Sequence, residues 1–223
     1  MSTLKEIKGS LKQAGFKKED IKAVLRLLPY LGALDELVFP ESPITIGFST
    51  SKNRFEHFAG YHPGKNAEVK YSIFVNGLAG RLQEEKERRG LWVPDIKTKP
   101  GHKKQSKLLK PTWEELLVPM AAHEVRHRVQ NECLCKKFSP LKSAKLIKDD
   151  LLRAIVIFEG YVLEENEKTW TKENKPKAFI KERMERTEFD ASVIERLVAV
   201  KIHGKNAYSL REEIVSIIKM SAP

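Results

Sequence analysis

The strongest constraint on the fold is a predicted helix at residues 113–135 that carries the pattern His-Glu-x-x-His. Thr112 and Glu115 stand at its start with the spacing of a capping box, in which each side chain satisfies a free backbone amide of the other residue. Further along, His123 and His127 are four residues apart, so both imidazoles lie on one face of the helix. The sequence therefore predicts a capped helix with two imidazoles on one stripe.

Two imidazoles at this spacing, with a carboxylate beside them, are typical of a zinc site. His123 and His127 each offer a ring nitrogen to one Zn²⁺, and Glu124 is placed to act as general base toward a water. Burying these three groups without a cation would leave several polar atoms unsatisfied. We therefore predict Zn²⁺ as cofactor, His123 and His127 as ligands and Glu124 as the catalytic residue.

A catalytic zinc usually takes three protein ligands, so a third must come from elsewhere in the chain. Glu188 lies on the apolar side of a predicted helix at 177–201, and the small Ala191 one turn later would let that helix approach closely. Glu159, on a predicted helix at 143–165, is the alternative. We favour Glu188 because a charge on that apolar side is costly unless it is paired or coordinated. The remaining histidines fall on no clear buried helical face: His57, His62, His102 and His203.

These residues resemble the gluzincins, the zincin metallopeptidases in which two His and one Glu bind zinc. The motif at 123–127 is followed by Glu-Phe-Asp-Ala at 188–191, and Glu-x-x-Ala on a later helix is typical of several such families. Those families often continue with Asp, whereas this chain has Ser192. The resemblance covers residues 43–200 in outline. It implies a zincin-like fold and zinc-dependent hydrolysis of peptide bonds, with Glu124 moving the proton.

The mechanism that this resemblance implies needs further groups. The strand around residues 71–75 is expected to be the sheet edge that pairs with an extended substrate. Asp190 is a candidate to hold a ligand imidazole in its tautomer. The donor that would stabilise an oxyanion is left open between Tyr208, His203 and Arg186.

The rest of the chain predicts an α+β fold: a small antiparallel or mixed sheet that precedes the active-site helix, and a mostly helical C-terminal half. Apolar residues alternate with polar ones around 44–49 and 69–75, and more weakly around 54–61, which indicates strands. Their short connections favour an antiparallel meander. A charged helix at 78–89 and a short helix at 209–219 complete the predicted elements.

The N-terminal segment predicts two helices, at 3–14 and at 18–28, with Pro29 ending the second. Two helices joined at a glycine could form a helix-turn-helix, but a small helical cap on the main core is favoured. The predicted domains are therefore an N-terminal helical cap at 1–35 and a zincin-like metallopeptidase domain at 36–223.

Composition limits the functional classes. The 223 residues are 41% hydrophobic, which favours a globular fold, and no segment reaches the ~18 consecutive apolar residues of a membrane span. The chain start lacks a signal sequence, and two cysteines one residue apart favour reduced thiols, so we expect a cytoplasmic protein with a peptide or protein substrate and no membrane.

The net charge of +11 suggests an alternative function. Basic residues gather in a loop at 97–110, which could bind nucleic acid, although a solvated surface is the favoured interpretation. The alternative is thus a nucleic-acid-associated zincin-like protein that acts on bound proteins or serves as a regulator.

Overall fold

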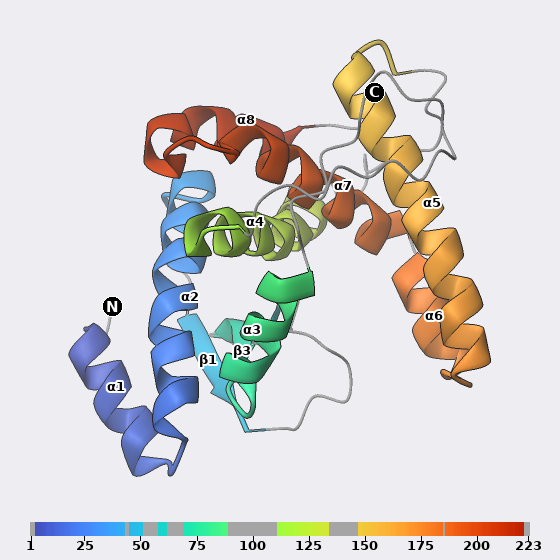
Figure 1. Ribbon diagram of the computed structural model, residues 1–223. Coiled ribbons are helices and arrows are strands. Elements are labelled where there is room, and N and C mark those ends of the chain that lie inside the picture. Colours follow the sequence, from blue (N-terminus) through green and yellow to red (C-terminus); the bar gives the residue numbers. More distant parts are fainter. Residues whose placement is uncertain are drawn as a thin grey trace.

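The computed structural model describes residues 3–42, 45–50, 58–61, 69–88, 111–133, 147–184 and 186–220. Its elements are α1 (Leu4–Gln13), α2 (Lys18–Val38), β1 (Thr45–Ser49), β2 (Ala59–Tyr61), β3 (Val69–Phe74), α3 (Leu78–Arg88), α4 (Trp113–Glu132), α5 (Asp150–Lys172), α6 (Lys177–Met184), α7 (Arg186–Ile202), the 3-10 helix η2 (Ala207–Leu210) and α8 (Arg211–Lys219). Helices make up most of this part of the chain, and the strands form one small mixed sheet (Figure 1), so the predicted α+β class is confirmed. Among the described helices, none combines the length and apolar character needed to cross a membrane.

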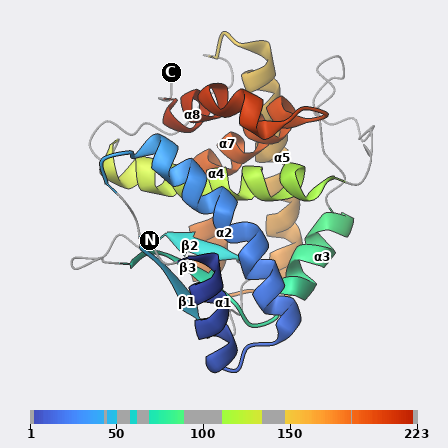
Figure 2. The ribbon, with the colours of Figure 1, turned by 90° about the vertical axis from the view of Figure 1, so that its left-hand side faces the viewer.

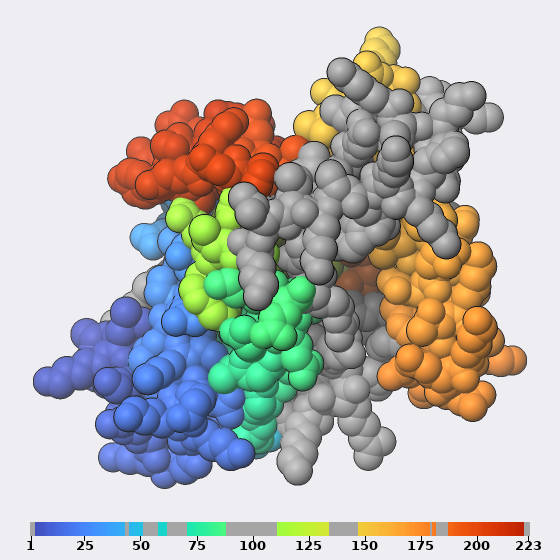
Figure 3. Space-filling view, viewed as in Figure 1, coloured from blue at the N-terminus to red at the C-terminus, as the bar shows by residue number. Residues whose placement is uncertain are grey.

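Helix α4 runs through the middle of the molecule. Two views of the ribbon place α8 on one side of α4 and the sheet on the opposite side (Figure 1 and Figure 2). α2 crosses α4, and α7 packs along it. α5 lies on the side away from α2, and Figure 3 shows the two on opposite flanks of the visible face, with α3 between them. Because neighbours cover α4 on several sides, its Leu117, Val125 and Arg128 are all fully buried.

The predicted capping box forms at the start of α4. The backbone N–H of Glu115 donates to Oγ1 of Thr112 at 3.1 Å, and the N–H of Thr112 donates to the Glu115 carboxylate at 2.8 Å. These bonds satisfy two of the amides that the first helical turn leaves free. The cap thus fixes where α4 begins, and with it the position of each later residue on the helix surface.

The sheet differs from the predicted meander. Its strand order is β1-β3-β2; β1 pairs with β3 in parallel, and only β2 and β3 are antiparallel. β2 follows β1 in sequence but pairs with the edge of β3 that lies away from β1, so β3 is the central strand. Alternation of apolar residues predicts β1 and β3 correctly, and β2 falls within the weaker prediction at 54–61, but the pattern carries no information on which strands become neighbours.

The prediction that residues 71–75 form a substrate-pairing edge is wrong. β1 and β2 pair with the two edges of β3, and the β3 residues Tyr71 and Ile73 are both 0% exposed. β2 is an edge strand instead, and it packs on α4. The strand that packs on the helix of the two histidines is therefore β2, which the sequence predicts only weakly as a strand.

Helix α2 corrects a second prediction, because it continues through Pro29 to Val38. A proline inside a helix removes one backbone hydrogen bond. Apolar residues of the following turns, Leu31 and Leu34, are buried in the core and stabilise the continued helix. The expected domain boundary between residues 35 and 36 falls inside this helix.

The C-terminal helices are also bounded differently from expectation. Asp149 caps α5 by accepting from the backbone N–H of Leu152, so the helix begins at Asp150 rather than 143, and it extends past 165 to Lys172. The single helix expected at 177–201 is present as α6 and α7, with residue 185 outside the described residues. Local capping contacts decided these ends, and apolar periodicity is insensitive to them.

Candidate metal centre

Three potential ligand atoms converge between α4 and α7. Nε2 of His123 lies 3.1 Å from Nε2 of His127; Oε2 of Glu188 lies 3.4 Å from the former nitrogen, and Oε1 of Glu188 lies 3.3 Å from the latter. The two helices are antiparallel, so the imidazoles on the middle of α4 meet the first turn of α7. All three side chains are 14–18% exposed, which leaves the cluster partly open on one side.

The rival glutamate has another role. Glu159 on α5 is buried, and its carboxylate accepts from Nε of Arg196 on α7 at 2.5 Å. The pair links α5 to α7 but contributes no atom to the cluster, whose members are His123, His127 and Glu188.

The charges around the cluster favour a bound cation. Burial alone would lower the pKa of His123, but Glu188 and Glu195 outweigh it and raise the pKa to about 10. Burial likewise opposes ionisation of Glu188, yet His123 and His127 hold the pKa of this carboxyl below its ordinary value. Positive charge among these atoms is therefore stabilised by carboxylates on two sides.

Glu195 faces the back of one imidazole. Its Oε2 lies 3.2 Å from Nδ1 of His123, on the side away from the cluster, and only 8% of the residue is exposed. Nδ1 has the distance but not the alignment of a hydrogen bond to this oxygen. The attraction between a charged imidazole and a carboxylate depends less on the donor angle than a hydrogen bond does, so the contact acts electrostatically. Glu195 stands two helical turns after Glu188, which puts both carboxylates on one face of α7.

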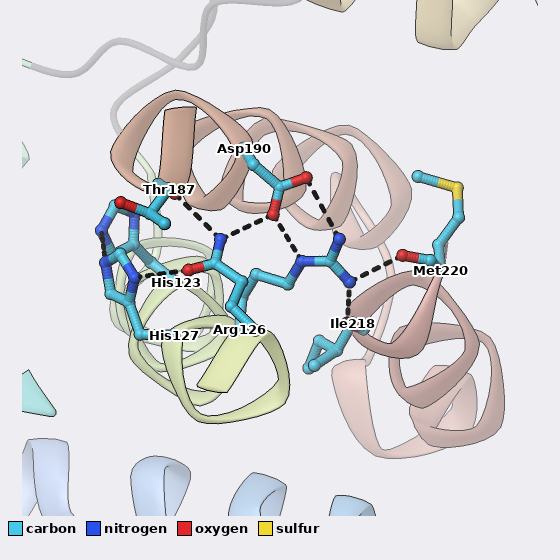
Figure 4. Close-up of polar contacts among 8 residues, drawn as sticks. His123, Arg126, His127, Thr187, Asp190, Ile218 and Met220 are labelled. Atoms are coloured by element: carbon cyan, nitrogen blue, oxygen red, sulfur yellow. Dashed lines mark hydrogen bonds and ion pairs between the residues drawn. The ribbon is translucent and has the colours of Figure 1, made fainter. Parts of the chain in front are cut away.

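Behind the other imidazole, a chain of polar contacts runs to the C-terminal end of α8 (Figure 4). Nδ1 of His127 lies 3.0 Å from Oε1 of Gln130, whose amide nitrogen donates to Asp190 at 2.7 Å. Arg126 binds both oxygens of Asp190, at 2.6 and 3.1 Å, and also donates to the backbone carbonyls of Ile218 and Met220. Asp190, expected to contact a ligand imidazole, is therefore one residue removed from it.

Glu124 points toward the sheet side of α4. Its carboxylate accepts from the backbone N–H of Tyr61 in β2 and is influenced by the charges of His123, His127 and Glu188. Burial raises the pKa of Glu124, and the two imidazoles oppose the rise. A carboxylate with a raised pKa, beside both the cluster and an edge strand, is suited to accept and return a proton.

A second buried network ties the edge strand and α2 to α4. Arg128, fully buried, donates to Asp35 of α2 at 2.5 Å, and Asp35 also accepts from the Tyr71 hydroxyl at 2.7 Å. Nε of Arg128 lies 3.1 Å from Glu132, which in turn accepts from the Tyr61 hydroxyl. These contacts fix the sheet against the helix that carries Glu124.

Two of the three oxyanion candidates, His203 and Tyr208, lie near the start of α4. His203 pairs with Glu115 at the start of α4, at the opposite end of the α4–α7 pair from the cluster. Tyr208 follows it in η2 and is 74% exposed. The side chain of Arg186 lies outside the described part, as do His57, His62, His102 and the basic loop at 97–110. His203 and η2, which carries Tyr208, therefore lie beside the first turn of α4.

Sequence reasoning missed the residues that support the ligands and those that hold α4 against its neighbours. Arg126 and Arg128 look like solvated charges on a helix, yet both are at most 1% exposed. A usable signal was present, because Gln130 is three residues after His127 and therefore shares its side of the helix.

Comparisons with protein-family models, with curated proteins and with solved structures gave no match. The geometry of the cluster is therefore the basis of the functional proposal.

Proposed function

We propose that this protein is a zinc-dependent peptidase with a zincin-like arrangement of its active site. The observation that carries the proposal is the convergence of two imidazole nitrogens from α4 and one carboxylate from α7. Two nitrogens and one oxygen form a donor set that catalytic zinc uses, with a fourth position left for water or substrate.

The spacing of the donors fits such an ion. Zinc–nitrogen and zinc–oxygen distances near 2.0–2.1 Å in a tetrahedron place neighbouring ligand atoms about 3.3 Å apart. The two imidazole nitrogens are 3.1 Å apart, and each has one oxygen of the Glu188 carboxylate at a similar distance, Oε2 at 3.4 Å from His123 and Oε1 at 3.3 Å from His127. Little movement of His123, His127 or Glu188 is therefore required to hold the ion.

Bound zinc would supply a Lewis acid that acidifies a water and polarises a carbonyl. Glu124 would take a proton from the attacking water while the oxygen of that water forms a bond to the scissile carbon. The same carboxyl would then return the proton to the nitrogen as the carbon–nitrogen bond breaks, leaving a free acid and a free amine. Burial raises the pKa of Glu124 above its ordinary value, which favours proton uptake by this carboxylate.

β2 supports an extended peptide as the substrate class. Phe58 is hydrogen-bonded to β3 through its carbonyl, and in an antiparallel ladder the backbone groups of the next residue point away from the partner strand. Ala59 and Tyr61 therefore direct their backbone groups toward the outer edge, where the Tyr61 amide already contacts Glu124. A peptide added as a further strand would lie beside the cluster.

Metal analysis of matched variants tests the proposal. The wild-type protein, loaded with zinc and then dialysed to remove unbound metal, is expected to retain about one zinc per chain. Glu188→Gln is expected to lose most of its zinc under the same treatment. Glu159→Gln is the matched control, since it makes the same change at the rival glutamate yet leaves the three donors intact, and it should retain zinc. A wild-type chain that binds no zinc, or equal zinc in both variants, would contradict the proposal.

A further inference from the structure

The amide of Gln130 can take only one orientation. Its nitrogen lies 2.7 Å from a carboxylate oxygen of Asp190 and 2.9 Å from the backbone carbonyl oxygen of Thr187. Both of these atoms accept hydrogen bonds and neither can donate, so the NH2 group must face them. The amide oxygen of Gln130 is thereby directed at Nδ1 of His127, at 3.0 Å.

This orientation decides the tautomer of His127. An amide oxygen only accepts, so Nδ1 must carry the proton that fills the contact. In the neutral ring the other nitrogen, Nε2, then has a free lone pair. Nε2 is the atom that lies 3.1 Å from His123 and 3.3 Å from Glu188.

The amide cannot easily turn over, because the groups behind it are held as well. Asp190 is fully buried, and both its oxygens are bound by the guanidinium of Arg126. Arg126 is itself 1% exposed and is fixed by the carbonyls of Ile218 and Met220. A reversed amide would place its oxygen against a buried carboxylate, with no donor available between them.

The two imidazoles are therefore supported in different ways. His123 faces the carboxylate of Glu195, which adds negative charge next to the ring. His127 faces a neutral amide, and the charge of Asp190 behind that amide is already matched by Arg126. The support of His127 supplies orientation without a further charge at the cluster.

We infer that Gln130 is a positioning residue that holds His127 as its Nδ1–H tautomer, with Nε2 prepared to bind the metal. This inference rests on the proposed zinc site, because it assigns a role to the atom behind one proposed ligand. The role extends through Asp190 and Arg126 to the end of α8, so residues of three helices set the state of one imidazole.

The test combines NMR with zinc affinity in wild-type protein, Gln130→Met and Gln83→Met. Methionine matches the length of glutamine but cannot accept the hydrogen bond, and Gln83 on the exposed side of α3, where its amide contacts Glu87, provides the same change outside the cluster. In zinc-loaded wild type, His127 is expected to bind through Nε2 and to show an exchange-protected Nδ1–H. Gln130→Met should lose that protection and bind zinc about 10–100-fold more weakly in a chelator competition; Gln83→Met should match wild type.

The outcomes separate this inference from the proposed function. If wild type binds zinc but His127 coordinates through Nδ1, or Gln130→Met keeps both affinity and protection, the role of Gln130 is overturned and the zinc site stands. If wild type binds no zinc, the proposed function fails and the inference fails with it. Should Gln130→Met not fold, the coordinating atom of His127 in wild type decides alone.

Discussion

Oε2 of Glu195 lies 3.2 Å from Nδ1 of His123, on the opposite side of the imidazole from the nitrogen that faces His127. α7 therefore contacts both ring nitrogens of His123, through Glu195 at Nδ1 and through Glu188 at Nε2. A carboxylate behind a ligand imidazole raises the basicity of the ring and fixes its direction. The pair thus couples the packing of α7 to the chemistry of the cluster.

Glu195→Gln is expected to weaken zinc binding by about tenfold or more, because it removes the negative charge behind His123 and keeps the size of the side chain. Chelator competition measures the change. Glu212→Gln, on the exposed side of α8, is the control and should have no effect. Equal affinity in all three proteins would show that the contact is not used in metal binding.

Glu124→Gln is expected to keep its zinc and to lower kcat/KM for peptide hydrolysis by about 10²–10⁴, since the amide cannot take up the proton. The substrate is a mixture of peptides, with new termini identified by mass spectrometry. Because Glu124 is not one of the three converging donors, metal content separates this variant from a ligand variant. Full activity in Glu124→Gln would remove it from the reaction.

Asp190→Ala is expected to lower the free energy of unfolding by about 3–5 kcal/mol, because it leaves the buried guanidinium of Arg126 without its carboxylate. Urea unfolding with a chelator present measures this without a contribution from metal. The double variant Arg126→Met with Asp190→Leu removes both charges and should recover much of the loss. A double variant as unstable as the sum of the single changes would argue against an uncompensated charge.

Glu115 is expected to make stability depend on acid. Burial opposes its ionisation, but hydrogen bonds from Gly204, Thr112 and His203 outweigh it and lower the pKa of this carboxyl. A carboxyl with a lowered folded pKa stabilises fully above its unfolded pKa, near 4.5, and loses this contribution as pH falls through the folded pKa.

Glu115→Gln should therefore cost about 1–3 kcal/mol at pH 7, and the difference from wild type should shrink below about pH 4.5. Unfolding curves at pH 7 and pH 3 measure it, with Glu36→Gln on the exposed side of α2 as the control. A difference that grows in acid would have the wrong sign for this explanation.

Some corrections to the predicted fold concern which segments become neighbours. The alternation in β3 predicted a strand, but its central place between β1 and β2 depends on pairings that no local pattern contains. Pro29 predicted a helix end, whereas burial of the turns that follow it keeps α2 helical. In both cases long-range packing decided what a short-range signal left open.

The sequence by itself determined the parts of the candidate site that are close along the chain. The cap at Thr112 sets the start of α4, and spacing by four puts His123 and His127 on one face with Glu124 beside them, because a helix repeats every 3.6 residues. The same periodicity placed Glu188 on the apolar side of its helix and so favoured it over Glu159, which stayed the alternative.

Only the tertiary structure decided which distant groups meet those residues. The antiparallel packing of α7 on α4 brings Glu188 to the imidazoles and leaves Glu159 paired with Arg196. It also sets Gln130 and Glu195 behind the two rings. Helical periodicity fixes directions within one helix, whereas the choice between two glutamates depends on how whole helices bury their apolar surfaces against each other.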